Sequence, residues 1–291
     1  FFIIFAGGIS GLVLAAMYLL ISGLLFQGAS DPEEIEERLG IPVQAVIPFS
    51  RKQELLNKKA QRFKGKEFDV LALSESKDPS IESLRSLRTS IQLTSNVREK
   101  NIISIMGTSP SVGKSFVSLN FSQVLADSGK RVLLIDADLR KGKLHRHYGN
   151  RRVPGLAAYL NDKADKNAII KPIHSGLDFI PCGKYPSNPS ELFMRDKFKY
   201  LLDEVSAEYD FILVDTPPIM AVTDALIIGQ HTDVNLLLVG LGKNQMSEIK
   251  IAVKRLGKSN VKVDGIVCNY FSKSIQYYSA NSYNYYYYSY K

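Results

Sequence analysis

The chain has 291 residues, of which 45% are hydrophobic, and a formal net charge of +8. This length can accommodate one large α/β domain with additional segments. Cys182 and Cys268 lie far apart in apolar stretches, with neither metal-ligand spacing nor a disulfide framework, which excludes the disulfide-rich secreted class and fits a reducing cytoplasm.

The N-terminal segment is uncharged and strongly apolar. A helix over residues 1–26 would be roughly 39 Å long at 1.5 Å per residue, which is enough to cross a bilayer core. Gly7, Gly11 and Ala15 recur at a spacing that favours close helix packing in lipid. A cleavable signal peptide would have a basic start and a shorter apolar run. We therefore predict a transmembrane helix over 1–26, and we expect the chain to be the C-terminal part of a longer protein, because it starts inside an apolar run without Met.

Residues 27–66 are predicted to be a juxtamembrane segment followed by a basic linker. Ser30 or Asp31 can cap a short helix that ends at Gly40, and 43–47 is apolar enough for a strand. Seven lysines and arginines crowd the part from residue 51 onward. Basic residues beside a membrane exit favour the cytoplasmic side and anionic lipids. Since no nucleic-acid reader motif accompanies them, we expect no nucleic-acid partner.

Residues 67–274 are predicted to form one α/β domain, because short apolar runs alternate there with amphipathic stretches. The predicted strands cover 102–106, 132–135, 179–180, 211–214, 234–239 and 265–267. The predicted helices cover 79–94, 114–128, 190–207, 222–230 and 246–257. Apolar strands alternating with helices predict a mostly parallel sheet covered by helices on both faces. Ligands of such sheets bind at the carboxyl ends of the strands.

The segment Gly107-Thr-Ser-Pro-Ser-Val-Gly-Lys-Ser115 follows the first of these strands. Strand, loop, Gly-Lys-Ser and helix in this order predict a P-loop, which binds phosphate through backbone N–H groups and Lys114, and binds Mg²⁺ through Ser115. Thr108 stands where the strict pattern has its first glycine. The predicted ATP-binding residues are Thr108, Ser109, Val112, Gly113, Lys114, Ser115 and Phe116.

Two further predicted strands end in carboxylates. Asp136 and Asp138 follow 132–135, and Asp215 follows 211–214. Alternation places Asp136 and Asp138 on one side, where they could bind Mg²⁺ or accept a hydroxyl proton. A single aspartate is equally typical of a turn or a helix cap. Three at the P-loop edge of one sheet predict a site for ATP and Mg²⁺, with Ser115, Asp138 and Asp215 as metal ligands.

The C-terminal segment, 275–291, is rich in tyrosine, with serine and asparagine between the rings. The predicted phosphate acceptors are Tyr277, Tyr278, Tyr283, Tyr285, Tyr286, Tyr287, Tyr288 and Tyr290. A polar segment of this kind cannot bury its rings, and it follows a site for ATP. We therefore predict a flexible tail that accepts phosphate; the alternative is a low-complexity terminus that only binds a partner.

The role of two histidines remains open. His145 and His147, in Lys143-Leu-His-Arg-His147, could ligate a metal, but a pair in such a basic stretch is more typical of the protein surface.

These motifs together resemble those of the bacterial tyrosine kinases (BY-kinases), in particular the membrane-bound type of Gram-negative capsule and exopolysaccharide systems. The resemblance rests on the P-loop, Asp136-Ala-Asp138-Leu-Arg140, Val214-Asp215-Thr-Pro-Pro218, Asn188-Pro-Ser-Glu191 and the tyrosine tail. The related partition and cell-division ATPases carry an additional lysine early in the P-loop, where this chain has Ser109. The motifs of eukaryotic-type kinases are absent from the sequence.

The resemblance implies a tyrosine autokinase that modifies the tail of a neighbouring subunit within a ring-like homo-oligomer. Lys114, Asp136 and Asp138 would be catalytic, with Asp136 accepting the tyrosine proton. Glu82, Arg85 and Arg88 match the family's Glu-x-x-Arg-x-x-Arg association motif, although their spacing alone also fits a solvated helical face with intrahelical pairs.

The resemblance also implies a location at the bacterial inner membrane, with the kinase domain and tail in the cytoplasm. The implied partners are a cytoplasmic tyrosine phosphatase and the polysaccharide export machinery. Two other functions stay open: a membrane-anchored ATPase of the partitioning type, and an ATP-binding structural export component without kinase activity. Stable phosphotyrosine after treatment with ATP would distinguish the kinase from both.

Overall fold

The computed structural model describes residues 7–8, 10–18, 28–62, 69–94, 101–149 and 152–272. Much of the predicted transmembrane helix, and the tail from residue 273 onward, lie outside the described residues. Over the described ranges, no helix combines the length and the apolar character needed to span a bilayer.

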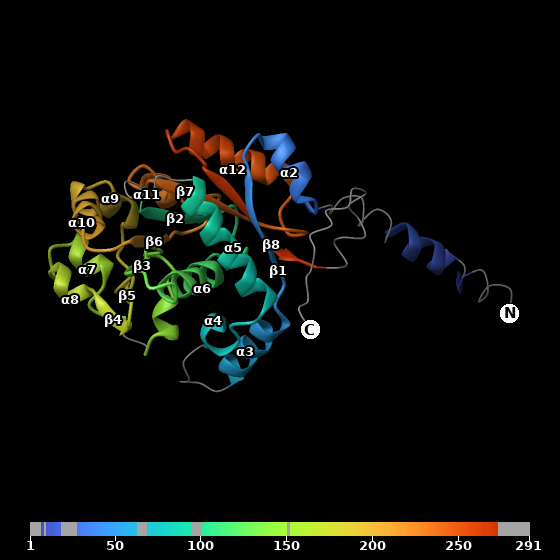
Figure 1. Ribbon diagram of the computed structural model, residues 1–291. Coiled ribbons are helices and arrows are strands. Elements are labelled where there is room, and N and C mark those ends of the chain that lie inside the picture. Colours follow the sequence, from blue (N-terminus) through green and yellow to red (C-terminus); the bar gives the residue numbers. More distant parts are fainter. Residues whose placement is uncertain are drawn as a thin grey trace.

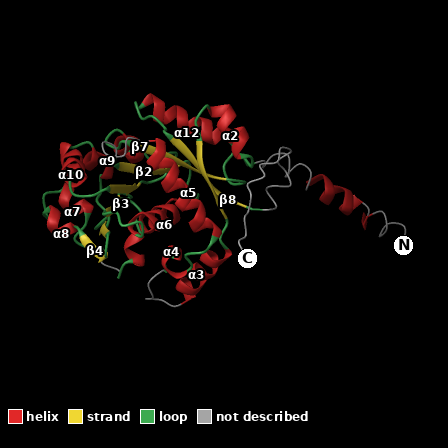
Figure 2. Ribbon diagram, in the orientation of Figure 1, coloured by secondary structure: helices red, strands yellow, loops and turns green. Residues whose placement is uncertain are grey.

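One eight-stranded sheet organises the domain (Figures 1 and 2), in the order β1-β8-β7-β2-β6-β3-β5-β4. The strands are β1 Val43–Pro48, β2 Ile102–Gly107, β3 Val132–Asp136, β4 Lys171–His174, β5 Leu177–Ile180, β6 Phe211–Asp215, β7 Val234–Gly240 and β8 Gly265–Phe271. Neighbouring strands are parallel except β4, which pairs antiparallel with β5 at one edge. The predicted α/β fold with a mostly parallel sheet is confirmed.

Helices cover both faces of the sheet (Figure 1). They are α2 Pro32–Leu39, α3 Arg51–Arg62, α4 Leu71–Ser74, α5 Pro79–Thr94, α6 Lys114–Ala126, α7 Leu156–Leu160, α8 Lys166–Ile169, α9 Pro189–Phe193, α10 Asp196–Ser206, α11 Asp224–Gly229 and α12 Met246–Lys258, with a short 3₁₀ turn η1 at Leu144–His147. Successive residues of β2 face opposite layers. Ile105 packs with residues of α5 and α6, whereas Met106 packs with residues of α12. Because both faces are buried, β2 and β7 are buried along their whole length.

The predicted helix after residue 30 is confirmed as α2. The side chain of Asp31 accepts a hydrogen bond from the backbone N–H of Glu33, and Gly40 ends the helix with φ of 64°. Part of the predicted basic linker is helical, because α3 forms there. Ser50 Oγ accepts from the N–H of Gln53 at 3.2 Å, and Leu56 packs against the core. Arg51, Lys52 and Lys58 are exposed, so their charges do not prevent a helix.

The single helix predicted over 190–207 is two helices, α9 and α10, separated after Phe193. Phe193 and Phe198 are both fully buried and meet edge to face, with their ring centroids 5.0 Å apart. Burial of both rings stabilises the arrangement in which α9 ends at Phe193 and α10 begins at Asp196. The edge strand β4 was not predicted, because its residues are only partly buried and show no apolar run.

Candidate active site

The P-loop connects the end of β2 to the start of α6, at the carboxyl edge of the sheet. Two of its residues have left-handed backbone conformations: Ser111 with φ of 63° and Gly113 with φ of 96°. A Cβ atom at Gly113 would overlap the side-chain amide of Asn269, so the position requires glycine. A loop of this kind, followed directly by a helix N-terminus, binds phosphate through its backbone N–H groups.

Two asparagines from neighbouring strands hold the P-loop in place. Asn244, just after β7, accepts a hydrogen bond from Thr108 Oγ1 at 2.8 Å and donates one to Ser109 Oγ at 2.7 Å. Asn269, in β8, donates from Nδ2 to the carbonyl of Val112 at 2.9 Å. The sequence reasoning missed both asparagines. The available signal was an amide side chain at the carboxyl end of each of two apolar strands.

Tyr270 and Lys243 lie against the outer side of the same loop. The Tyr270 hydroxyl donates to the carbonyl of Ser111 at 3.1 Å. The Lys243 ammonium lies 3.3 Å from the centroid of the Tyr270 ring, a cation–π contact. These contacts support the left-handed turn at Ser111.

Lys114 and Ser115 open helix α6 beside the carboxylate of Asp215. The Lys114 side chain is 9% exposed, and burial lowers its pKa against the opposing effect of Asp215 and Asp138. Ser115 Oγ donates to Asp215 Oδ2 at 3.3 Å, and Ser118 Oγ donates to the other carboxylate oxygen at 2.9 Å. Burial raises the pKa of Asp215 to about 6, although Lys114 and the two serines act against this. The group therefore combines one cation with hydroxyl and carboxylate oxygens.

Asp136 is the last residue of β3 and lies directly opposite Asp215 in the parallel register of β3 and β6. Its side chain is fully buried. The N–H of Leu144 donates to Oδ2 at 3.2 Å, whereas Oδ1 has no hydrogen-bond partner among the described residues. Burial, and then the charge of Asp215, raise the pKa of Asp136 well above its usual range. A Cβ atom at Gly142 would overlap this carboxylate, so the turn after β3 lies directly against it.

Asp138 is half-buried and organises the turn that follows it. Its Oδ1 accepts from the N–H groups of Arg140 at 3.1 Å and Lys141 at 2.8 Å. The Arg140 side chain donates to the fully buried Asp224 from Nε at 2.8 Å and from Nη2 at 3.0 Å, and the hydroxyl of Ser190 also donates to Asp224. The role of Arg140 and Ser190 in this network was not foreseen, although both belong to segments on which the resemblance rests.

His145 is not at the surface, contrary to the expectation from its basic neighbours. Its residue is only 7% exposed, because Asp136 anchors the N–H of Leu144 and the following residue of η1 turns inward. Burial, and then the nearby cation of Arg152, lower the pKa of His145. His147 is half-buried.

The residues of the predicted association motif lie on α5. Arg85 donates to Glu82 at 2.6 Å and to the carbonyl of Ser76 at 2.9 Å. Arg88 follows one turn later and is half-buried. Within the subunit, Glu82 and Arg85 form the intrahelical pair that their spacing allows, and an intersubunit role for the three residues stays a prediction.

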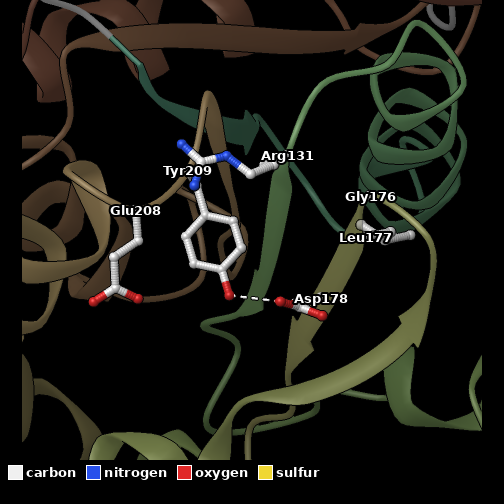
Figure 3. A pocket seen from close by; sticks show the side chains of 6 residues that line it. All are labelled: Arg131, Gly176, Leu177, Asp178, Glu208 and Tyr209. Atoms are coloured by element: carbon white, nitrogen blue, oxygen red, sulfur yellow. Dashed lines mark hydrogen bonds between the residues drawn. The ribbon is translucent and has the colours of Figure 1, made fainter.

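Two cavities lie near the ends of the strands. The larger, of about 370 Å³, is at the amino end of β3 and β5, opposite the P-loop edge. Figure 3 shows its lining residues, among which the Tyr209 hydroxyl donates to Asp178 at 2.6 Å. The smaller, of about 160 Å³, adjoins the P-loop, with Ser115 and Phe116 in its lining together with residues of α3. Of these two cavities, the smaller is the one placed to serve the P-loop.

Comparisons with known proteins agree with this geometry. Residues 100–247 match a family model described as an AAA domain. The chain is 41% identical to the tyrosine-protein kinase ptk of Acinetobacter johnsonii over 276 residues, which is 93% of this chain and 36% of the relative. It is 37% identical to the tyrosine-protein kinase wzc of Salmonella typhimurium over 295 residues, covering 99% of this chain and 40% of the relative. The chain thus spans little more than a third of the length of these curated relatives.

Solved structures of kinase domains are similar over their whole length. The BceF tyrosine kinase domain has a TM-score of 0.80 and 38% identity, with 84% of this chain and 100% of that chain covered. The kinase domain of the Escherichia coli tyrosine kinase ETK has a TM-score of 0.78 and 38% identity, with 89% and 99% covered.

Proposed function

Because this chain belongs to the bacterial tyrosine kinase family, we propose that it is an ATP-dependent protein-tyrosine kinase that modifies its own C-terminal tail. One observation carries the proposal: a buried carboxylate with an unpartnered oxygen, Asp136, lies opposite Asp215 at the sheet edge where the P-loop begins. Phosphoryl transfer requires, besides the P-loop and a metal ligand, a residue that orients the incoming nucleophile. A second, separate carboxylate suits a reaction in which a protein hydroxyl must lose its proton.

Thr108, Ser109, Val112, Gly113, Lys114, Ser115 and Phe116 are proposed to bind ATP. The loop backbone would hold the phosphates, and Lys114 would stabilise the charge that develops on the transferring phosphoryl group. Its buried position makes this interaction stronger than it would be in water. Positioning and electrostatic stabilisation supply most of the catalysis in phosphoryl transfer, so a pre-formed loop held by Asn244 and Asn269 is an asset.

The residues around Asp215 fit Mg²⁺, which prefers oxygen ligands and binds proteins through one or two carboxylates together with substrate phosphates. Ser115 donates to Asp215, and Asp138 follows two residues after Asp136, which lies opposite Asp215 in the sheet. We assign the metal to Ser115, Asp138 and Asp215. When bound, Mg²⁺ would neutralise phosphate charge and orient the ATP.

Asp136 is proposed to accept the proton of the incoming tyrosine hydroxyl at Oδ1, the oxygen without a partner. Burial, and then the charge of Asp215, raise the pKa of Asp136, which makes its carboxylate a stronger base. Since Asp136 is fully buried beneath Gly142, the turn after β3 must move before a phenol can reach it. Arg140, which ties this turn to Asp224, would limit that movement.

The eight tail tyrosines from Tyr277 to Tyr290 are the proposed acceptors, and transfer to the tail of a neighbouring subunit is preferred. Glu82, Arg85 and Arg88 on α5 would contribute to a ring-like homo-oligomer. By family membership, the chain would lie at the bacterial inner membrane, with 1–26 as its membrane helix and 67–274 as its cytoplasmic kinase domain. The phosphorylated tail would regulate polysaccharide polymerisation and export, and a cytoplasmic tyrosine phosphatase would remove its phosphates.

Intact-mass and phosphotyrosine analysis after incubation with Mg²⁺ and ATP tests this function. We expect several phosphates on residues 277–290 of the unaltered chain and none on Lys114→Met. Lys258→Met, which removes an exposed lysine at the end of α12, is the matched control and should keep the modification. Consumption of ATP with an unmodified tail would refute the kinase and favour an ATPase.

A further inference from the structure

Three side chains that are distant in the sequence meet beneath the turn after β3. Asp136 ends β3, His145 lies in η1, and Cys182 follows β5 by two residues. Because β3 and β5 pair in parallel, with Ile135 opposite Ile180, their carboxyl ends bring Asp136 and Cys182 side by side. One ligand atom from each of the three residues lies within 4.8 Å of the others.

The polar atoms of this cluster are buried and poorly satisfied. Asp136 and Cys182 are fully buried, and His145 is 7% exposed. Within the part of the chain that the structure describes, Asp136 Oδ1 and His145 Nδ1 have no hydrogen-bond partner. The thiol of Cys182 donates to the carbonyls of Gly142 and Gly183, each at 3.5 Å, so the unsatisfied atoms of the cluster belong to Asp136 and His145. Because an unpaired buried polar atom is costly, a ligand that satisfies both of these atoms at once would be favoured.

We propose that Asp136, His145 and Cys182 form a cation site for a thiophilic divalent ion of the Zn²⁺ type, distinct in its ligands from the adjacent site of the ATP metal, since Asp136 lies opposite Asp215. Thiolate, imidazole and carboxylate are the ligand set that Zn²⁺ prefers, whereas Mg²⁺ requires oxygen ligands. A tetrahedral ion would place ligand atoms about 3.5 Å apart, so the cluster must contract by roughly 1 Å. The turn that carries Gly142 and His145 can supply this contraction, since the outward-facing Lys141, Lys143 and Arg146 are exposed.

The surroundings favour the ligand-competent form of His145, whereas burial raises the pKa of Cys182 to about 12, so the thiol would lose its proton only as the ion binds. Burial keeps His145 neutral, which leaves a nitrogen lone pair available to a metal. Arg152 donates to the carbonyl of Gly183 at 2.7 Å, and its positive charge acts to lower the pKa of the Cys182 thiol against the larger effect of burial. The bound ion would displace the thiol proton, and the two anionic ligands would balance its charge.

Occupancy of the cluster would silence the kinase, and this part of the inference rests on the proposed function. A metal bound through Asp136 Oδ1 removes the oxygen that would accept the tyrosine proton. It would also join the turn after β3 to β5 through Cys182, which prevents the movement that an incoming phenol requires. Micromolar Zn²⁺ should therefore inhibit tail phosphorylation even when Mg²⁺ and ATP are in large excess.

Co²⁺ is the probe for the binding test, because thiolate ligation of Co²⁺ gives a near-ultraviolet charge-transfer band and a tetrahedral site gives strong visible bands. The 291-residue chain would be titrated with Co²⁺ in the presence of millimolar Mg²⁺. We expect one equivalent to bind with both signatures, and the charge-transfer band to disappear in Cys182→Ser. Cys268→Ser, which alters the other buried cysteine, should keep it. Absence of the band in the unaltered chain, or its persistence in Cys182→Ser, would overturn the site.

The inhibition test then separates this site from the proposed function. For Zn²⁺ added to the phosphorylating chain, we expect the half-inhibitory concentration to rise at least tenfold in Cys182→Ser and to stay unchanged in Cys268→Ser. Equal inhibition of the two variants would overturn the regulatory role. Cobalt binding that depends on Cys182, in a chain that never modifies tyrosine, would retain the site and refute only the kinase.

Discussion

The ion pair between Arg140 and Asp224 provides a quantitative test of how the turn after β3 is held. Asp224 is fully buried and accepts two hydrogen bonds from the guanidinium of Arg140 and one from Ser190. Arg140→Met keeps most of the side-chain volume but leaves the Asp224 carboxylate buried with one neutral donor. We expect this variant to lose stability and to loosen the segment that lies against Asp136.

The size of the loss follows from the burial of the two partners. Removing one partner from a fully buried ion pair costs about 3–5 kcal/mol. The Arg140 side chain is 37% exposed, so water can partly replace it and the expected cost is about 2–3 kcal/mol. For a domain of this size, that loss lowers the Tm by roughly 4–12 °C.

Thermal and urea unfolding of the unaltered chain and Arg140→Met measure this effect. Arg131→Met is the matched control, because the Arg131–Asp210 pair is 3.9 Å apart with side chains 66% and 38% exposed. Its loss should cost less than about 0.5 kcal/mol. The double variant Arg140→Met/Asp224→Asn should recover about 1–2 kcal/mol relative to the sum of the two single changes, because no buried charge is left unpaired. Equal costs for Arg140→Met and Arg131→Met, or simple additivity in the double variant, would refute the reasoning.

Three further predictions concern the P-loop, the turn over Asp136, and the metal. Asn244→Ala removes the hydrogen bonds to Thr108 and Ser109. It should weaken binding of a fluorescent ATP analogue about tenfold, or about 1.4 kcal/mol, with little change in secondary structure. Unchanged affinity would contradict the role of Asn244. Gly142→Ala places a methyl group against the Asp136 carboxylate. This change should abolish tail phosphorylation, while binding of the ATP analogue persists. Full kinase activity would show that this turn is not close to the reacting groups. Chelation of divalent metals should stop phosphorylation, and added Mg²⁺ should restore it; continued transfer after chelation would exclude the proposed metal ligands.

The sheet and the P-loop could be predicted because local signals and tertiary structure agree there. Fully buried parallel strands are mostly apolar, as in β2 and β7, where the buried Ser104 and Asn235 hydrogen-bond to each other. Gly-Lys-Ser in the loop after such a strand is typical of a phosphate-binding loop. The basic stretch over α3 misled the prediction for a physical reason. Charge describes the solvated face of a helix, whereas the contact of Leu56 with the core decides whether the helix docks.

The remaining parts of the site depend on which strand ends are neighbours, and no local pattern contains that information. Asn244 and Asn269 become P-loop supports only because β7 and β8 lie on the same side of β2 in the sheet order. Cys182 shows no metal-ligand spacing in the sequence, yet the pairing of β3 with β5 places it beside Asp136. His145 was expected at the surface because its neighbours are basic. The N–H of Leu144 instead donates to Asp136, and this hydrogen bond holds the turn so that His145 lies inside.

Transfer of phosphate from one chain to the tail of another tests the central claim most directly. An active chain truncated after residue 272 would supply the kinase site without acceptors, and full-length Lys114→Met would supply acceptors without activity. Mixed with Mg²⁺ and ATP, the pair should yield phosphotyrosine on residues 277–290 of Lys114→Met, while neither chain alone yields any. If the mixture hydrolyses ATP and no tail tyrosine is modified, the chain is not a tyrosine kinase that acts on its own tail.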